Sequence, residues 1–122
     1  MLIIDTSILI EHFRKKDKIK TSLYRISNQN LCITSITYFE IMSGFRNVDV
    51  SFMTELVDLF PILNFEKKAA YFASRIYYEL RSINKLIDIP DILIAGTALA
   101  NNLKLATLNK RHFSRIKGLK MD

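Results

Sequence analysis

Four short apolar runs, separated by segments with helical spacing, are the feature that most limits how this chain can fold. The runs are Leu2 to Ile4, Leu31 to Ile33, Ile62 to Leu63 and Leu103 to Ala106. Strands that alternate with helices pair in parallel, because each right-handed crossover returns the chain to the same end of the sheet. We therefore expect an α/β domain with a largely parallel sheet.

The segments between the runs carry apolar residues at helical intervals. Asn64 stands where it can cap the longest of these helices. The length of 122 residues is that of one domain, so residues 1–122 are expected to form a single unit. The expected helices are Ser7 to Arg14, Ile36 to Phe45, Val50 to Phe60, Glu66 to Ile83 and Ile89 to Asn101.

Composition excludes several classes of protein. No apolar stretch approaches the roughly 18 residues of a membrane helix, and the first residues lack the basic and apolar regions of a signal peptide, so we expect none. Cys32 is the only cysteine, which excludes an internal disulfide and a thiolate zinc site and fits a reducing compartment. We expect a cytoplasmic protein, and its net charge of +6 favours a polyanionic partner.

Polar residues follow the apolar runs at the points where the strands end. Asp5, Thr6 and Ser7 follow the first run, Thr34 and Ser35 the second, and Thr107 and Asn109 the last. The carboxyl ends of parallel strands meet at one edge, which is where open α/β sheets bind ligands. The sequence therefore predicts a functional site at this edge.

Three acids are expected to meet there. Asp5 ends the first strand, Glu40 lies about 9 Å along a helix that begins at the same edge, and Asp91 lies in the first turn of a helix that runs opposite to the strands. Each has a plain structural alternative. Asp5 or Asp88 can cap a helix, Asp91 can stabilise a helix dipole, and Glu40 can lie on a solvated face. These alternatives leave the convergence of the three acids unexplained, because clustered carboxylates repel one another unless a cation or a shared proton holds them.

Such a cluster of oxygen ligands suits Mg²⁺ or Mn²⁺, and the chain has no paired-histidine motif for zinc. Divalent ions held in this way activate water and neutralise charge on a phosphate under attack. A basic protein with such a site is expected to hydrolyse phosphodiester bonds in a nucleic acid. A phospho-acceptor receiver domain and an Asp-x-Asp phosphatase do not fit, because Thr6 and Ser7 occupy the places of their second acids.

Several blocks together resemble a PIN domain of the VapC-like toxin group. They are LIIDTSILI at residues 2–10, TSITYFEI ending at Ile41, DIPDILIAGTALANNLKLATLNKRHF at 88–113, and IKGLK near the C-terminus. The resemblance implies a three-layer α/β/α sandwich and a metal-dependent endoribonuclease that is the toxin of a toxin–antitoxin pair. It further implies a homodimer and a small antitoxin partner.

The resemblance also assigns roles to single residues. Asp5, Glu40 and Asp91 match the family's first three acids, which bind the metal, and five polar residues match supporting positions. Many relatives have a fourth acid where this chain has His112, so we expect one firmly held ion, and the alternative role for His112 is structural. The supporting positions are Thr6, Ser7, Thr107, Asn109 and His112.

Two further surfaces are open to alternative interpretations. Lys110, Arg111 and Arg115 follow the predicted edge and are candidates for RNA contact, whereas residues 14–20 are basic but are expected to be solvated. His12 is expected to be structural. An apolar set on the predicted helix 50–60 can form either an antitoxin groove or ordinary core: Phe52, Met53, Leu56 and Phe60. The rival to a nuclease is a catalytically weak PIN-like module that binds RNA or protein.

Overall fold

The computed structural model describes residues 1–44 and 50–122. Its centre is a four-stranded parallel sheet in the order β3-β2-β1-β4. The strands are β1 (Leu2–Ile4), β2 (Leu31–Thr34), β3 (Ile62–Leu63) and β4 (Lys104–Ala106), which lie within a residue of the predicted runs. The C-terminal segment adds a parallel bridge between Leu105 and Met121 at the β4 side.

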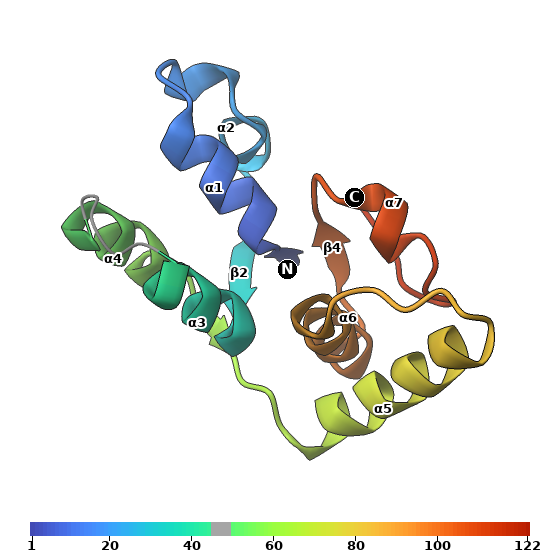
Figure 1. The fold of residues 1–122 in the computed structure, drawn as a ribbon. Helices are drawn as coiled ribbons and strands as arrows, with labels where there is room; N and C mark the ends of the chain where they lie inside the picture. The colour runs from blue at the N-terminus through green and yellow to red at the C-terminus, as the bar shows by residue number, and fades with distance from the viewer. Residues whose placement is uncertain (45–49) are drawn as a thin grey trace.

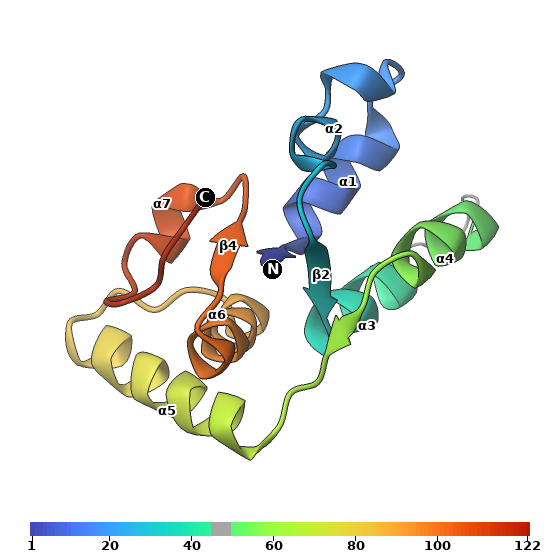
Figure 2. The same ribbon diagram turned by 180° about the vertical axis from the view of Figure 1, so that it is seen from behind.

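Helices cover both faces of this sheet, as Figures 1 and 2 show. Helices α1 (Thr6–Arg14), α2 (Ser22–Ile26), α3 (Ser35–Gly44) and α4 (Val50–Asp58) pack on one face. Helices α5 (Lys67–Ser82), α6 (Ile89–Asn101) and α7 (Lys110–Phe113) pack on the other. The predicted three-layer α/β/α sandwich is therefore confirmed.

Alternation along the strands divides the buried side chains into two cores. Leu2 and Ile4 point into the α1–α4 layer, whereas Ile3 points into the α5–α7 layer. Cys32 and Ile33 divide in the same way. This period of two is what a strand buried on both faces requires, and it places β1 in the middle of the molecule.

Helices α5 and α6 cross at very close range. An added Cβ on Gly96 would lie 2.7 Å from the Ala69 carbonyl oxygen and 2.8 Å from the Ala73 Cβ. Only glycine allows this approach, so Gly96 determines how α6 lies against α5.

Three short elements were not predicted: the 3₁₀ turn Lys18–Lys20, α2 and α7. The residues 14–20 were expected to be only a solvated basic run, but Lys18 has a structural role. Its Nζ donates to the carbonyls of His12, Phe13 and Lys15 at 2.6–2.8 Å and so satisfies the C-terminal end of α1.

One capping prediction was wrong: Glu66, not Asn64, occupies the N-cap position of α5, and it makes no side-chain capping bond. Asp88 occupies the N-cap position of α6 as predicted, although its side chain makes no capping bond. Phe45, predicted to end a helix, lies outside the described residues. Within the described residues, no helix is long and apolar enough to cross a membrane.

Candidate active site at the carboxyl edge of the sheet

Asp5 directly follows the central strand β1, and its side chain is buried. Its carboxylate accepts hydrogen bonds from the Ser7 backbone N–H and the Thr107 hydroxyl. The first of these bonds caps α1, so the structural alternative for Asp5 is also correct. Burial raises the pKa of the Asp5 carboxyl, and the bonds from Thr107 and Ser7 oppose that rise.

Hydroxyl groups link the segments after β1 and β4 around Asp5. The Ser7 hydroxyl lies 3.4 Å from the Thr107 hydroxyl and accepts from the Leu108 backbone N–H at 3.0 Å. The Thr107 hydroxyl in turn accepts from the Asn109 backbone N–H at 2.9 Å. Ser7 and Thr107, both predicted as supporting residues, therefore hold the Asp5 carboxylate in place.

Glu40 lies at the same edge on α3 and is half-buried, which excludes the alternative of a fully solvated face. The Thr6 hydroxyl, which follows Asp5, donates to Glu40 Oε1 at 2.7 Å. This bond joins the start of α1 to α3, across 34 residues of chain. Thr6 therefore connects the first predicted acid to the second.

The Asp91 carboxylate accepts a hydrogen bond from the Asn109 side chain, which follows β4. The Asn109 amide Nδ2 lies 3.3 Å from Asp91 Oδ2 and 3.0 Å from His112 Nδ1. Because an amide NH₂ group only donates hydrogen bonds, His112 Nδ1 is the acceptor in this contact. Asn109 thus places the third acid and His112 next to the same side chain.

The charges of the other two acids act on Asp91. The pKa of Asp91 is raised to about 6, first by burial and then by the negative charges of Asp5, Glu40 and Asp88. A carboxyl whose ionisation is opposed by two distant segments of the chain lies within Coulombic reach of both. Asp91 therefore lies near enough to Asp5 and Glu40 for both charges to oppose its ionisation.

The three carboxylates do not form a closed cage. Among the described residues, no three Asp, Glu, His or Cys side chains are already grouped as metal ligands. Glu40 is hydrogen-bonded to Thr6 and Asp91 to Asn109. Mutual repulsion of like charges opposes closer grouping of the carboxylates.

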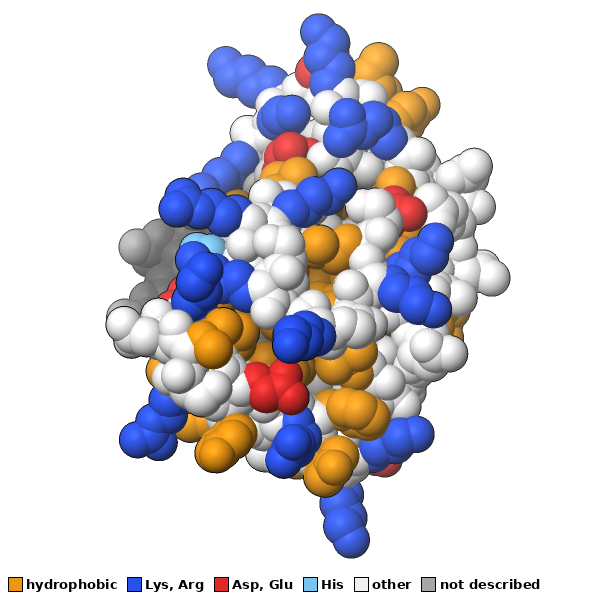
Figure 3. Space-filling view, turned by 90° about the vertical axis from the view of Figure 1, so that its right-hand side faces the viewer, with side chains coloured by type: hydrophobic (Ala, Val, Ile, Leu, Met, Phe, Trp, Pro, Cys, Tyr) orange, Lys and Arg blue, Asp and Glu red, His pale blue; other side chains and the backbone are white. Residues whose placement is uncertain are grey.

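The predicted RNA-contact residues fall into two groups. Lys110 and Arg111 are exposed on α7, directly after Asn109. The Arg115 guanidinium instead donates to the carbonyls of Lys85 and Leu86 at 3.3 and 3.4 Å, which ties the segment after α7 to the one that leads into α6. Figure 3 shows Lys and Arg side chains spread over one face of the molecule, with fewer Asp and Glu side chains between them.

The apolar set of the α4 region belongs to the core. Met53 is buried, and Leu56 and Phe60 pack against the same cluster. Phe52 is more exposed, and its ring centroid lies 5.7 Å from that of Phe13. The structure therefore favours the core alternative over a groove made by these four residues. His12 is structural, as expected: its Nδ1 lies 2.6 Å from the Thr21 hydroxyl.

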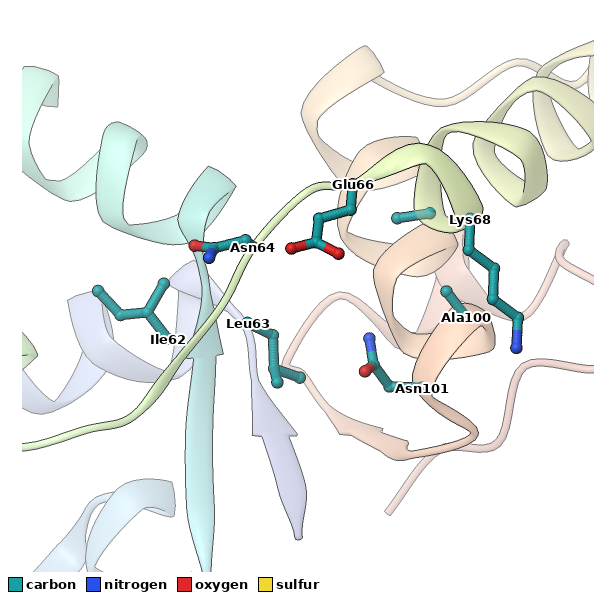
Figure 4. Close-up of a pocket in the computed structure, with 8 residues that line it drawn as sticks. Ile62, Leu63, Asn64, Glu66, Lys68, Ala100 and Asn101 are labelled. Atoms are coloured by element: carbon teal, nitrogen blue, oxygen red, sulfur yellow. The ribbon is translucent and has the colours of Figure 1, made fainter.

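A hollow of about 260 Å³ lies between β3, α5 and α6 (Figure 4). Its polar lining includes Asn64, Glu66, Lys68 and Asn101, and none of the predicted site residues lines it. Figure 4 shows Asn64 and Glu66 on the segment that joins β3 to α5, opposite Asn101. The hollow therefore contributes nothing to the acidic cluster.

Thr37, a fully buried residue of α3, was not predicted from the sequence. Its hydroxyl lies 3.3 Å from the Thr6 hydroxyl and 3.4 Å from the Thr34 hydroxyl. A signal for it exists in the sequence, because Thr37 precedes Glu40 by three residues and so shares its helix face.

Comparison with known proteins identifies one family model, the PIN domain, which matches residues 2–119. Two relatives come from Methanocaldococcus jannaschii. Ribonuclease VapC3 is 40% identical over 94 residues, which cover 77% of this chain and 94% of that protein. Ribonuclease VapC1 is 33% identical over 122 aligned residues, which cover 98% of this chain and 85% of that protein.

A solved structure shows the same fold. It is the crystal structure of VapBC2 from Rickettsia felis bound to a DNA fragment from their promoter. The match has a TM-score of 0.83 and 25% sequence identity, and it covers 99% of this chain and 96% of that one.

Proposed function

Because the chain belongs to the PIN-domain family and is similar over most of its length to VapC ribonucleases, we propose that it is an endoribonuclease that hydrolyses RNA phosphodiester bonds with Mg²⁺ or Mn²⁺. The observation that supports the metal dependence is the pKa of Asp91, which is raised to about 6 first by burial and then by the charges of Asp5 and Glu40. A site that gathers three acids at an electrostatic cost is built for a cation.

The residues present fit such an ion. The acids supply only oxygen donors, which are the ligands that Mg²⁺ and Mn²⁺ prefer. Asp5, Glu40 and Asp91 would hold the ion, and its charge would relieve the repulsion that raises the pKa of Asp91. The imidazole of His112 is a poor ligand for Mg²⁺ but an acceptable one for Mn²⁺, which supports one firmly held ion.

The bound ion would supply an activated water and would neutralise charge on the scissile phosphate. The protein supplies orientation. Thr107 and the Ser7 backbone hold the Asp5 carboxylate, Thr6 holds Glu40, and Asn109 holds Asp91. These bonds restrict the carboxylates before substrate arrives, so less ordering is needed during reaction.

Lys110 and Arg111 are the proposed contacts to the RNA backbone. Both are exposed and follow Asn109 directly, so a strand bound at the acidic site passes beside them. Arg115 is a weaker candidate, because its guanidinium already contacts the carbonyls of Lys85 and Leu86.

The chain is further proposed to be the toxin of a toxin–antitoxin pair, to form a homodimer and to act in the cytoplasm. The structural neighbour from Rickettsia felis, solved as VapBC2 on promoter DNA, supports a small antitoxin partner. Cys32 is a buried free thiol, which fits a reducing compartment.

The purified protein is expected to cleave RNA in Mg²⁺ or Mn²⁺ and to lose that activity in excess EDTA. Gel analysis of a labelled RNA before and after chelation, followed by restoration of the ion, measures this. Cleavage that persists in EDTA would refute the metal mechanism. RNA that is bound but never cut, with either ion present, would instead identify a binding module.

A further inference from the structure

A hollow of about 210 Å³ lies beside the acidic site, between α2 and the segment that follows β4. Thr107 belongs to both, because it lines the hollow and its hydroxyl donates to the Asp5 carboxylate. Leu108, the next residue, also lines the hollow, and its backbone N–H donates to the Ser7 hydroxyl at 3.0 Å. The hollow therefore borders the residues that hold Asp5.

Two cationic side chains from distant parts of the chain line this hollow. Arg25 lies on α2 and Lys110 begins α7, and both are exposed. Neither takes part in the two salt bridges found within the described residues. The pKa of Glu11 is lowered first by the bond from the Ser22 backbone, and the charge of Arg25 has the smallest effect on it. Both positive charges therefore remain largely free for an anion from outside the chain.

Arg25 is held at the hollow by the contact between α1 and α2. The Ser22 backbone N–H donates to Glu11 Oε1 at 2.6 Å, which fixes the start of α2 against α1. Arg25 Nη2 in turn donates to the Ser22 hydroxyl at 2.8 Å. A guanidinium has five N–H donors, and this is the one hydrogen bond seen at Arg25 in the part of the chain that the structure describes. Most of its donors are therefore available, on a side chain whose position is restrained.

Asp122 is the acid in the lining, and it limits the positive charge of the hollow. Its backbone N–H donates to the Leu105 carbonyl at 3.0 Å, which holds it beside β4. Within the described residues it forms no ion pair with Arg25 or Lys110. The two cations outnumber this one acid, so the hollow attracts an anion.

From this geometry we infer that the hollow binds a backbone phosphate of the RNA strand, next to the phosphate that lies at the acids. A guanidinium binds phosphate through two parallel hydrogen bonds, and an ammonium adds a point charge. The apolar part of the lining, which includes Ile8, Ile26 and Leu108, suits the sugar of the same nucleotide. An RNA phosphate fits better than an acidic peptide, because the hollow borders the proposed site of phosphodiester hydrolysis. The inference rests on the proposed function and extends the RNA path from α7 to α2.

The test is the binding of a short labelled single-stranded RNA to the full chain, measured by fluorescence anisotropy in EDTA over a range of salt concentrations. Arg25→Gln removes the charge and keeps a polar side chain. We expect RNA binding to be about 10-fold weaker at low salt, the low end for a lost charge-assisted hydrogen bond. The plot of log binding constant against log salt concentration should also become less steep by about 0.7, as for one lost phosphate contact.

Arg75→Gln is the matched control, because Arg75 is an exposed arginine of α5 that does not line this hollow. It makes the same change in net charge, so an effect of net charge alone is equal in the two variants. We expect Arg75→Gln to bind RNA within about 2-fold of the wild type, as for an exposed charge that makes no contact. Thermal unfolding of both variants in EDTA shows whether either substitution disturbs the fold. Equal losses of RNA affinity in two folded variants would overturn the inference.

Asp122→Asn tests the same hollow with the opposite sign. Removing the acid from the lining is expected to tighten RNA binding about 3-fold, within the range of a single exposed charge interaction. Asp58→Asn is its control, because Asp58 is exposed on α4 and does not line the hollow. Weaker binding by Asp122→Asn, or equal gains in the two variants, would contradict a phosphate bound between Arg25 and Lys110.

Two-dimensional NMR of the ¹⁵N-labelled protein in EDTA identifies the occupant. A trinucleotide should move the backbone amide signals of Ser22, Arg25 and Leu108 at a lower concentration than inorganic phosphate does, because it also contacts the apolar lining. Inorganic phosphate that binds as tightly as the trinucleotide would identify a free-anion site and overturn the RNA assignment. Movement with a Glu-rich peptide, but not with the trinucleotide, would identify a protein-docking site and overturn it as well.

Failure of the inference is distinguishable from failure of the proposed function. If RNA is cleaved but Arg25→Gln behaves as Arg75→Gln does, the inference fails and the proposed function stands. If RNA is bound through Arg25 but never cut, the inference stands and the proposed function fails. If the wild type neither binds nor cleaves RNA, both fail. For a protein that cleaves, Arg25→Gln is expected to raise KM more than it lowers kcat, because this phosphate is bound equally before and during the reaction.

Discussion

The negative charge of Asp91, which the proposed activity needs, also destabilises the metal-free protein. Its folded pKa of about 6 lies above the ordinary value of 3.8, so the folded state binds a proton that the unfolded state has already released. The metal-free protein should therefore lose stability as the pH rises from about 4 to 6, and the full cost remains at pH 7.

Replacing Asp91 by Asn is expected to remove that cost and to abolish cleavage. Asparagine keeps an oxygen that can accept from Asn109 but carries no charge. Because Asp91 is only half-buried, we expect a gain on the order of 1–2 kcal/mol at pH 7 in EDTA. Thermal unfolding at pH 5 and pH 7 measures it, and the gain should shrink at pH 5.

Asp88→Asn is the control for this substitution, because Asp88 precedes α6 and makes no side-chain capping bond. It should retain most of the cleavage activity. A loss equal to that of Asp91→Asn would show that Asp88 is a ligand, and a less stable Asp91→Asn protein would contradict the electrostatic argument.

His112 stands where the resemblance to the VapC-like group implies a fourth acid. Its Nδ1 lies 3.0 Å from the Asn109 amide, which also contacts Asp91. His112→Asp would add a second carboxylate beside Asp91 and should raise Mn²⁺ stoichiometry from one to two in calorimetry. His112→Asn serves as the uncharged control, and two ions on the wild type would disprove the expectation.

At the scale of elements, the close crossing of α5 and α6 is the contact that places Asp91. Gly96→Ala would push a Cβ to 2.7 Å from the Ala69 carbonyl oxygen. We expect a loss of about 1–3 kcal/mol in unfolding free energy from overpacking, although alanine is the better helix former by about 1 kcal/mol. Chemical denaturation measures this loss.

Gly44→Ala provides the comparison, since a Cβ there meets nothing within 4 Å. It should leave stability unchanged or slightly raised. Because Asp91 lies in the first turn of α6, a shift of that helix in Gly96→Ala should also reduce cleavage. A Gly96→Ala protein as stable as the wild type would mean that α5 and α6 do not meet as closely as described.

Helices and strands could be predicted where a pattern of apolar residues extends along the chain. An element was missed where one side-chain hydrogen bond determines the local structure. The strands are short continuous apolar runs, and α5 and α6 carry long apolar stripes, so both could be predicted. The turn at Lys18–Lys20 depends instead on where one ammonium group reaches, namely three carbonyls at the end of α1. Composition gives no sign of such a contact.

The same division applies to the site. Asp5, Glu40 and Asp91 could be predicted because strand ends and helix starts meet at one edge of a parallel sheet. The spacing of Thr37 from Glu40 places both on one helix face, but only the folded structure shows that the Thr37 hydroxyl lies near those of Thr6 and Thr34. The predicted cap of α5 was wrong because the capping residue depends on where the helix begins. The sequence pattern locates that start only to within a few residues.

At the scale of the whole molecule, the net charge of +6 and the acidic site have opposite signs. RNA must approach through the positive field and then place a phosphate beside carboxylates, which a bound cation makes possible. Binding of single-stranded RNA should therefore weaken steeply as salt rises, both with and without the divalent ion.

Replacing Lys110 and Arg111 together by Gln tests where that field acts. Each lost contact between a basic side chain and a phosphate should make the plot of log binding constant against log salt concentration less steep by about 0.7 for a single strand. We therefore expect a change of about 1.4 for the two residues together. Fluorescence anisotropy in EDTA measures binding while cleavage is blocked. Lys16→Gln, which removes an exposed charge beyond the far end of α1, should leave both the slope and the affinity at low salt nearly unchanged. Equal reductions in the two variants would mean that RNA is attracted by net charge alone, with no preferred path past α7.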